Sequence, residues 1–222
     1  MKHNEQEMEF LKEELYQMWK MVISQLEKVK QSFLKNDVNL AAEVIAVEKS
    51  VNAFELKMDK SCEGYIALYT PVAIDLRLIL SIMKISVTLE RIGDYANGIA
   101  RHVKHGECSH FNDTVVEMLD VEPMFDALLS MMTDSYVAFN SESSANTQKI
   151  LAKDKEVNEI YRQSIKKLTE YAKQNQEDTH CVMMILLLIR NMERIGDHCK
   201  NIVEEIVFYL DAKVLKHKGK TD

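Results

Sequence analysis

The chain has 222 residues, enough for one domain or for two of about 110 residues. Its net charge of −7 argues against sequence-independent binding of nucleic acid, which needs a basic surface. With 46% apolar residues, two prolines and six glycines, the composition is typical of a globular protein built from long helices.

The sequence also indicates a compartment. The longest apolar run, Cys181 to Ile189, is far shorter than the roughly 20 residues of a membrane span. The segment from Met1 to Glu5 is polar and unlike a signal peptide. Four cysteines occur without C-x-x-C spacing: Cys62, Cys108, Cys181 and Cys199. We read them as small core residues in a reducing compartment, and we predict a cytoplasmic protein.

The first predicted helix opens at Asn4, because Asn4 and Glu7 have the spacing of a capping box, and it ends near Asn36. Trp19 is expected to pack beside its apolar seam. The seam residues follow one another at spacings of three and four, as in a helix bundle: Met8, Leu11, Leu15, Met18, Val22, Leu26, Val29 and Phe33.

Asp37 is expected to cap a second helix that ends near Tyr69. Its apolar stripe consists of Leu40, Val44, Val47, Val51, Phe54, Met58 and Cys62. A polar row runs beside the stripe, formed by Glu48, Asn52, Glu55 and Asp59. Because the row adjoins the stripe, we expect it to face a groove between helices.

The third predicted helix begins at Thr70 as the cap and Pro71 as the first helical residue, and it runs to about His105. A short turn makes the second and third helices antiparallel neighbours. Counting back from the turn places Glu55 and Asp59 at the height of Glu90 and Asp94. Four such carboxylates would repel one another strongly unless a cation lay between them.

The helical pattern weakens from Gly106 to Glu122, which we interpret as a linker. A fourth helix is predicted from Pro123 and a fifth from Ser141. After a turn at residues 174–178, the sixth helix continues to about Leu210.

One pentapeptide occurs twice, as Glu90-Arg91-Ile92-Gly93-Asp94 and again, 103 residues later, as Glu193-Arg194-Ile195-Gly196-Asp197. We call it the ERIGD motif. An identity of this kind inside matching helical patterns indicates an internal repeat. We therefore predict an all-α fold with two three-helix bundles in tandem, residues 1–110 and 111–222, and six long helices.

The composition of the ERIGD motif is unfavourable for a helix. Its Glu and Asp project from one face and repel each other, and a glycine inside a helix costs about 1 kcal/mol relative to alanine. A cation held by the carboxylates, or the close approach of another backbone at the glycine, would offset these costs. The alternative is a solvated face on which Arg91 and Arg194 neutralise their neighbours.

The doubled motif, the stretch Thr70-Pro71-x-x-x-Asp75-Leu76-Arg77 and the stretch Asp154-Lys155-Glu156-Val157 resemble the PhoU family over essentially the whole chain. The resemblance implies two bundles related by a pseudo-twofold, in a cytoplasmic, homodimeric negative regulator of inorganic phosphate transport and phosphate-starvation signalling. It implies two partners, the ATP-binding subunit of the phosphate ABC transporter and the phosphate-sensing histidine kinase. Membrane contact is expected only through these partners. The implied cofactors are divalent or trivalent metal ions, usually iron clusters, with Mn, Mg or Zn as alternatives.

Carried over onto this sequence, the implied metal-binding residues are Glu55, Asp59, Glu90, Asp94, Asp154, Glu193, Asp197 and Asn201. In the second half, Asn158 stands where an acid is expected beside Asp154. In the first half, Gly98 stands where the counterpart of Asn201 is expected. The first half therefore carries more charge, and we expect it to bind its cation more tightly.

Three functions remain open: a non-enzymatic metal-binding regulator, a helical adaptor without an ion, and a di-metal carboxylate enzyme. Oxygen ligands favour hard cations over zinc or copper. Di-metal enzymes of this type use Glu-x-x-His, but Gly93 and Gly196 occupy the histidine position. His102 and His198 are poorly placed to join the motif carboxylates. With no glycine-rich phosphate loop either, we expect no enzyme activity.

Overall fold

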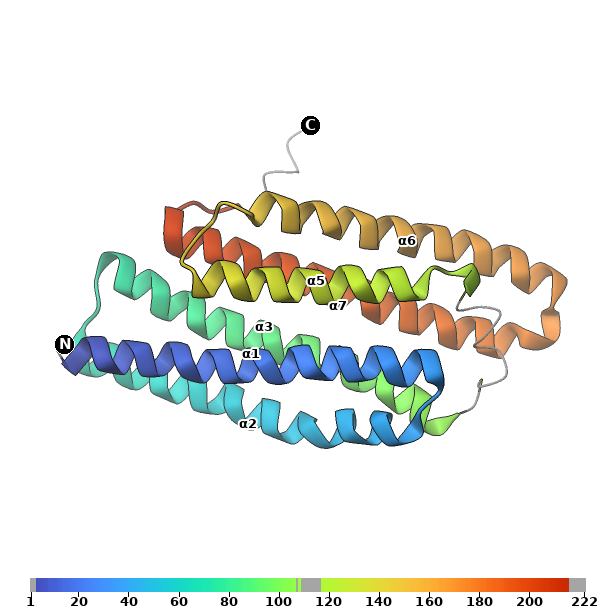
Figure 1. Cartoon of the computed structure of the whole chain (residues 1–222), viewed down its shortest axis with the longest axis horizontal. Helices are drawn as coiled ribbons and strands as arrows, with labels where there is room; N and C mark the ends of the chain where they lie inside the picture. Colours follow the sequence, from blue (N-terminus) through green and yellow to red (C-terminus); the bar gives the residue numbers. More distant parts are fainter. Residues whose placement is uncertain (1–2, 107, 109–116, 216–222) are drawn as a thin grey trace.

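A computed structural model describes residues 3–106, 108 and 117–215 of the chain. In this part of the chain there are six long α-helices, one short 3-10 helix and no strand (Figure 1). The helices are α1 (His3–Lys35), α2 (Val38–Tyr69), α3 (Ala73–His105), α5 (Val121–Asn140), α6 (Thr147–Gln174) and α7 (Thr179–Asp211), with η2 at Gln176–Asp178. The prediction of an all-α fold with six long helices is confirmed.

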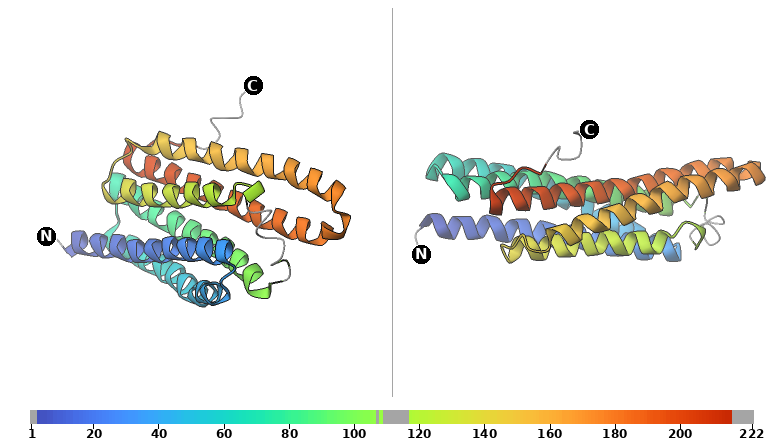
Figure 2. Two further views of the ribbon diagram at one scale, coloured as in Figure 1. Left: turned by 45° about the vertical axis from the view of Figure 1, so that its right-hand side comes forward. Right: turned by 90° about the horizontal axis from the view of Figure 1, so that it is seen from above.

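The helices pack in two groups of three. Helices α1, α2 and α3 contact one another, as do α5, α6 and α7. The groups meet where α3 lies along α7 and α1 along α5, so that α2 and α6 lie at the outer edges (Figures 1 and 2). Seen from above, α1 and α5 form one layer and α3 and α7 the other.

One hydrophobic core runs through both groups. All eight residues of the predicted α1 seam are buried, as is Trp19, which is fully inaccessible. The Trp19 ring contacts Tyr136 and Phe139 of α5, with both centroid separations at 5.9 Å. Each large apolar side chain buried this way stabilises the fold by roughly 1.5–3 kcal/mol. The prediction that Trp19 packs in the core is confirmed.

The helix boundaries differ from the predictions at several places. Asp37 caps α2 as expected, because its carboxylate accepts hydrogen bonds from the backbone N–H groups of Asn39 and Leu40, at 2.9 and 3.1 Å. Thr70, predicted to open the third helix, instead ends α2 in the left-handed region with φ 43°, and α3 begins only at Ala73. Asn4 already lies inside α1 and is not its cap.

A similar correction applies in the second half. Ser141, predicted to open the fifth helix, ends α5, and α6 begins six residues later at Thr147. Helix α5 begins at Val121, so Pro123 lies in its first turn. Most of the predicted linker, and the predicted boundary between residues 110 and 111, fall outside the described residues.

The cysteines depart from the expectation of four free thiols. Cys108 and Cys181 form a disulfide with a Cα–Cα distance of 5.6 Å, whereas Cys62 and Cys199 are free and buried. The pairing joins the segment after α3 to the first turn of α7, across 73 residues, so no local spacing could reveal it. The argument for a reducing compartment from four free thiols therefore loses its basis.

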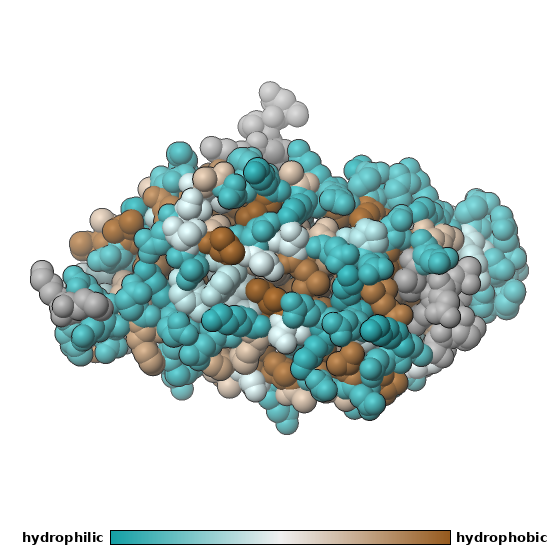
Figure 3. Space-filling model, viewed as in Figure 1, coloured by the Kyte–Doolittle hydropathy of each residue, from teal (hydrophilic) through white to brown (hydrophobic). Residues whose placement is uncertain are grey.

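Bilayer crossing demands a long helix of low charge, and none within the described residues meets that requirement. The face of the molecule seen in Figure 3 is largely hydrophilic, with apolar side chains exposed between polar ones.

Candidate functional site

The two ERIGD motifs lie on α3 and α7, which pack against each other in antiparallel directions. Near one end of the contact, Arg77 and Ser81 of α3 donate hydrogen bonds of 3.2 Å to backbone carbonyls of α7. Near its middle, the rings of Tyr95 and His198 contact each other at a tilt of 32°, with centroids 5.6 Å apart. These two residues hold the same place relative to their motifs, one position after the final Asp. Contact between equivalent positions is what two repeats related by a pseudo-twofold produce.

The motif glycines lie where other helices approach closely. A Cβ on Gly93 would lie 3.1 Å from Gln25 Oε1 and 3.5 Å from Val51 Cγ1. A Cβ on Gly196 would lie 3.2 Å from Val157 Cγ1. Close packing thus accounts for a glycine in each motif without an ion. The approaching groups are side chains, however, and not the backbone that we expected.

The same contacts give the register between the halves. Val51 of α2 packs on Gly93 as Val157 of α6 packs on Gly196, so these valines are equivalent. Asp154 precedes its valine by three residues, as Glu48 does in the first half. Asp154 therefore corresponds to Glu48, and not to Glu55 as the carry-over from the family assumed. Glu48 was in the predicted polar row but was not singled out; its carboxylate pairs with Arg101 at 3.2 Å.

In the first half, the candidate carboxylates lie on α2 and α3. Burial raises the pKa of Glu55, and the neighbouring Asp59 adds to the effect. Burial also raises the pKa of Glu90, followed by the charge of Asp94 and a smaller contribution from Glu55. Arg91 opposes both shifts. Of the predicted convergence of four carboxylates, only the effect of the Glu55 charge on Glu90 is seen across α2 and α3, and the convergence itself stays a prediction.

In the second half, Asp154 is the most buried of the candidate residues, with 7% of its surface exposed. Its Oδ2 accepts a hydrogen bond from the Asn158 amide at 3.1 Å, whereas its Oδ1 has no hydrogen-bond partner among the described residues. Burial is the largest cause of its raised pKa, opposed by Lys200 and reinforced by Asp197. The pKa of Glu193 is likewise raised, by burial, then by Asp197 and more weakly by Asp154.

The donor set suits a hard cation, because every candidate ligand offers oxygen and Asp154 carries a buried oxygen that lacks a partner. Within the described ranges, however, no three His, Cys, Asp or Glu side chains are arranged so that they could hold a metal ion. Asn201 lies half-buried one helical turn after Asp197. The ring of His198 contacts that of Tyr95, and His102 is buried in the last turn of α3.

The chain is similar to known proteins in sequence and in fold. The family model described as the PhoU domain matches residues 15–103 and 121–206. The phosphate-specific transport system accessory protein PhoU of Escherichia coli K12 is 31% identical over 213 residues, 96% of this chain and 87% of that protein. The homolog from Aquifex aeolicus is 30% identical over 96% of this chain and 95% of its own.

Two solved structures share the fold. The crystal structure of PhoU from Pseudomonas aeruginosa superposes with a TM-score of 0.88 at 27% identity, covering 94% of this chain and 99% of that one. The phosphate transport system regulatory protein PhoU from Streptococcus pneumoniae gives 0.85 at 24% identity, covering 96% and 99%, which supports the fold alone.

Proposed function

The chain belongs to the PhoU family of non-enzymatic phosphate-transport accessory proteins, and from this premise we propose that it regulates inorganic phosphate uptake as a metal-binding adaptor. The observation that carries the proposal is the match of both halves to the PhoU domain. We propose that it acts in the cytoplasm, as a homodimer, on the ATP-binding subunit of the phosphate ABC transporter and on the phosphate-sensing histidine kinase.

The metal part of the proposal rests on the acids gathered beside the two ERIGD motifs. Burial, with neighbouring acids, raises the pKa of Glu55, Glu90, Asp154 and Glu193, so that keeping these groups charged costs free energy in the metal-free protein. A bound cation would remove that penalty. The residues that would hold it are Glu55, Asp59, Glu90 and Asp94 in the first half, and Asp154, Glu193, Asp197 and Asn201 in the second. The ion, with iron the first candidate, would link the two helices that carry its ligands.

One observation favours the alternative of an adaptor without an ion. Packing alone accounts for the glycines of both motifs, and the carboxylates would have to change conformation before three of them could share a cation. The two functions differ in a direct measurement. Protein purified without chelator should contain bound metal if the acids are ligands, and none above background if they are an ordinary polar face.

The ligand assignment is tested by two double variants. Glu90→Gln with Asp94→Asn should lower the bound metal more than Glu193→Gln with Asp197→Asn, because the first half offers four carboxylates and the second three. If only the second variant loses metal, burial of Asp154 outweighs the number of charges.

Helix α5 supplies a matched control for these variants. Glu122 and Asp126 have the same spacing on one helix, but their side chains are 60% and 59% exposed and pair with Lys30. Glu122→Gln with Asp126→Asn should leave the metal content unchanged. Equal metal content in all three variants would show that the motif acids are not ligands.

The adaptor part of the proposal is tested by measuring binding of the purified chain to the ATP-binding subunit and to the histidine kinase. Light scattering over a range of concentrations tests the homodimer, and a concentration-independent monomer mass would contradict it. Fractionation of cells tests the cytoplasmic location.

A further inference from the structure

A cleft of about 540 Å³ opens between the two halves at the end of the molecule where α1 begins. We call it the α1 cleft. Its floor is apolar and is formed by Met8 and Leu78, which are nearly inaccessible. Its walls come from α1, from the end of α2, from the start of α3, from the α5–α6 connection and from the end of α7. It is separate from the acids beside the ERIGD motifs, none of which lines it.

The α1 cleft has a negative charge. Among the described residues that line it, Glu5, Glu9, Asp75 and Glu142 are acidic and Lys12 is basic, a formal charge of −3 for this part of the lining.

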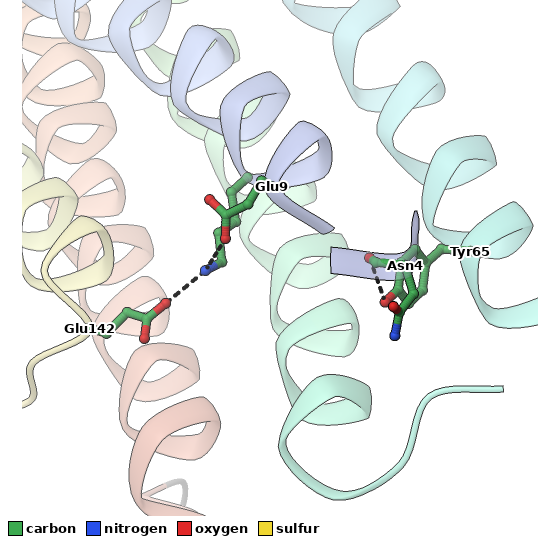
Figure 4. A network of polar contacts seen from close by, with 5 residues as sticks. Asn4, Glu9, Tyr65 and Glu142 are labelled. Atoms are coloured by element: carbon green, nitrogen blue, oxygen red, sulfur yellow. Dashed lines mark hydrogen bonds and ion pairs between the residues drawn. The ribbon is translucent and has the colours of Figure 1, made fainter. Parts of the chain in front are cut away.

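The Lys12 ammonium is held between two of these acids, 3.1 Å from Glu9 and 2.7 Å from Glu142 (Figure 4). Burial alone would lower the pKa of Lys12, but the hydrogen bonds to Glu142 and Glu9 raise it above its usual value. Lys12 is therefore a fixed cation whose positive charge is balanced by Glu9 and Glu142. The acids that line the cleft outnumber this one lysine, so the charge of the described lining is negative.

Polar groups are also fixed in the walls of the cleft. The Tyr65 hydroxyl, on a side chain only 5% exposed, donates to the backbone carbonyl of Asn4 at 3.2 Å (Figure 4). Tyr209 is 3% exposed and lies beside Glu142, whose charge adds to burial in raising its pKa to about 12. A preformed concave site with an apolar floor and a few oriented polar groups is the usual form of a binding site.

Exposed aliphatic side chains lie at the turn between α2 and α3, which reaches the α1 cleft at Ile74. Leu68, Val72 and Ile74 are 77%, 72% and 47% exposed, and Ile74 also lines the cleft. Figure 3 shows apolar side chains at the surface of this end of the molecule. An apolar patch beside a charged pocket is typical of a protein interaction site.

We propose that the α1 cleft docks a partner protein through a segment that inserts a lysine or arginine side chain among its acids and packs apolar side chains on Leu68, Val72 and Ile74. Charge complementarity selects this occupant, because the cleft attracts an ammonium or guanidinium group. The same charge repels anionic lipid headgroups and nucleic-acid phosphates. The exposed aliphatic side chains of Leu68, Val72 and Ile74 favour a protein or peptide over a free polyamine, because a polyamine has no apolar side chains to cover them.

The choice of partner rests on the proposed function, so the probe is the purified ATP-binding subunit of the phosphate transporter, with the histidine kinase as a second probe. Two variants test the two parts of the surface: Leu68→Ser with Val72→Ser, and Glu5→Gln with Asp75→Asn. We expect each to weaken binding by roughly tenfold or more, and binding by the wild type to weaken as salt is added.

Matched controls lie on other surfaces. Leu56→Ser with Val137→Ser replaces aliphatics that are 61% and 54% exposed, and Glu122→Gln with Asp126→Asn removes two exposed acids. Both controls should bind like the wild type. Circular dichroism and the fluorescence of buried Trp19 verify that every variant is folded.

The outcomes are distinct. If the cleft variants and the controls all bind like the wild type, the docking surface is wrong and the proposed function stands. If the folded wild type binds neither the ATP-binding subunit nor the histidine kinase, both the docking surface and the proposed function are wrong. If the cleft variants instead change the mass of the chain alone in light scattering, the occupant is a second copy and the proposed partner is wrong.

Discussion

The motif glycines provide a test of whether packing explains the ERIGD repeat, because they can be compared with Gly64, a helical glycine in different surroundings. A Cβ on Gly64 of α2 would meet no described atom within 4 Å, outside the adjacent helix backbone. Gly64→Ala should therefore gain the full helix propensity of alanine, about 1 kcal/mol. For a chain of this length, that corresponds to a rise in Tm of roughly 2–4 °C.

Gly196→Ala gains the same propensity but places a methyl group 3.2 Å from Val157 Cγ1. Because valine has a stiff χ1, it cannot move aside easily, and overpacking of this kind typically costs about 1–3 kcal/mol. We expect a net change from about zero to a loss of about 2 kcal/mol.

Gly93→Ala should fall between the other two variants. Its close neighbour, at 3.1 Å, is the end of the longer Gln25 side chain, which can shift if it gives up its 3.3 Å hydrogen bond to the Val44 carbonyl. We expect its stability to stay within about 1 kcal/mol of the wild type, because the gain in propensity and the lost hydrogen bond are of similar size.

Urea unfolding in the presence of chelator measures all three variants, with the single tryptophan, buried Trp19, as the fluorescent reporter. The expected order of stability is Gly64→Ala above Gly93→Ala above Gly196→Ala. If Gly196→Ala were as stabilising as Gly64→Ala, the Val157 contact would not explain the motif glycine and the packing argument would be refuted.

Three further perturbations have expected outcomes. The folded protein raises the pKa of Glu90 above its usual 4.5, so ionisation of this carboxyl lowers the stability of the folded state as the pH rises beyond that value. Glu90→Gln should therefore stabilise the metal-free protein at neutral pH but not near pH 4.5. A stability difference in urea unfolding that did not change with pH would contradict this prediction. Replacing Cys108 and Cys181 together by Ser should lower the free energy of unfolding by about 2–4 kcal/mol in the absence of reductant, and reductant should no longer affect unfolding. Four titratable thiols in the denatured wild type would rule out the disulfide. Lys12→Met should lower the free energy of unfolding by at most about 1 kcal/mol in thermal unfolding, because the carboxylates of both partners, Glu9 and Glu142, are more than half exposed. A loss several times larger would mean that these ion pairs are stronger than exposed pairs usually are.

Much of the fold follows from the sequence because its signals are local. The seam on α1 repeats at helical spacing, and Asp37 sits where a cap is needed, so both were predicted correctly. Thr70 and Ser141 were assigned to the wrong side of a helix break. The residue before a proline is disfavoured in the α region, so Thr70 marks a break without showing whether it ends one helix or starts the next.

The candidate site was harder to derive, because it depends on how helices are aligned across the fold. The α1–α2 connection has two residues, whereas α5 and α6 are separated by six. The carry-over from the family therefore placed Asp154 opposite Glu55, and the contacts at Gly93 and Gly196 identify Glu48 as its counterpart. The disulfide is non-local in the same sense, since its cysteines lie 73 residues apart.

The ring contact between Tyr95 and His198 bears on how such a chain can originate. In an assembly of two separate identical chains, a residue beside the symmetry axis meets its own copy, and any substitution there changes both sides of the contact at once. When gene duplication fuses the two copies into one polypeptide, the positions become independent and can be selected for each other. In this chain the phenol ring of Tyr95 contacts the imidazole ring of His198, and two identical chains could not place two different residues opposite each other at their symmetry axis.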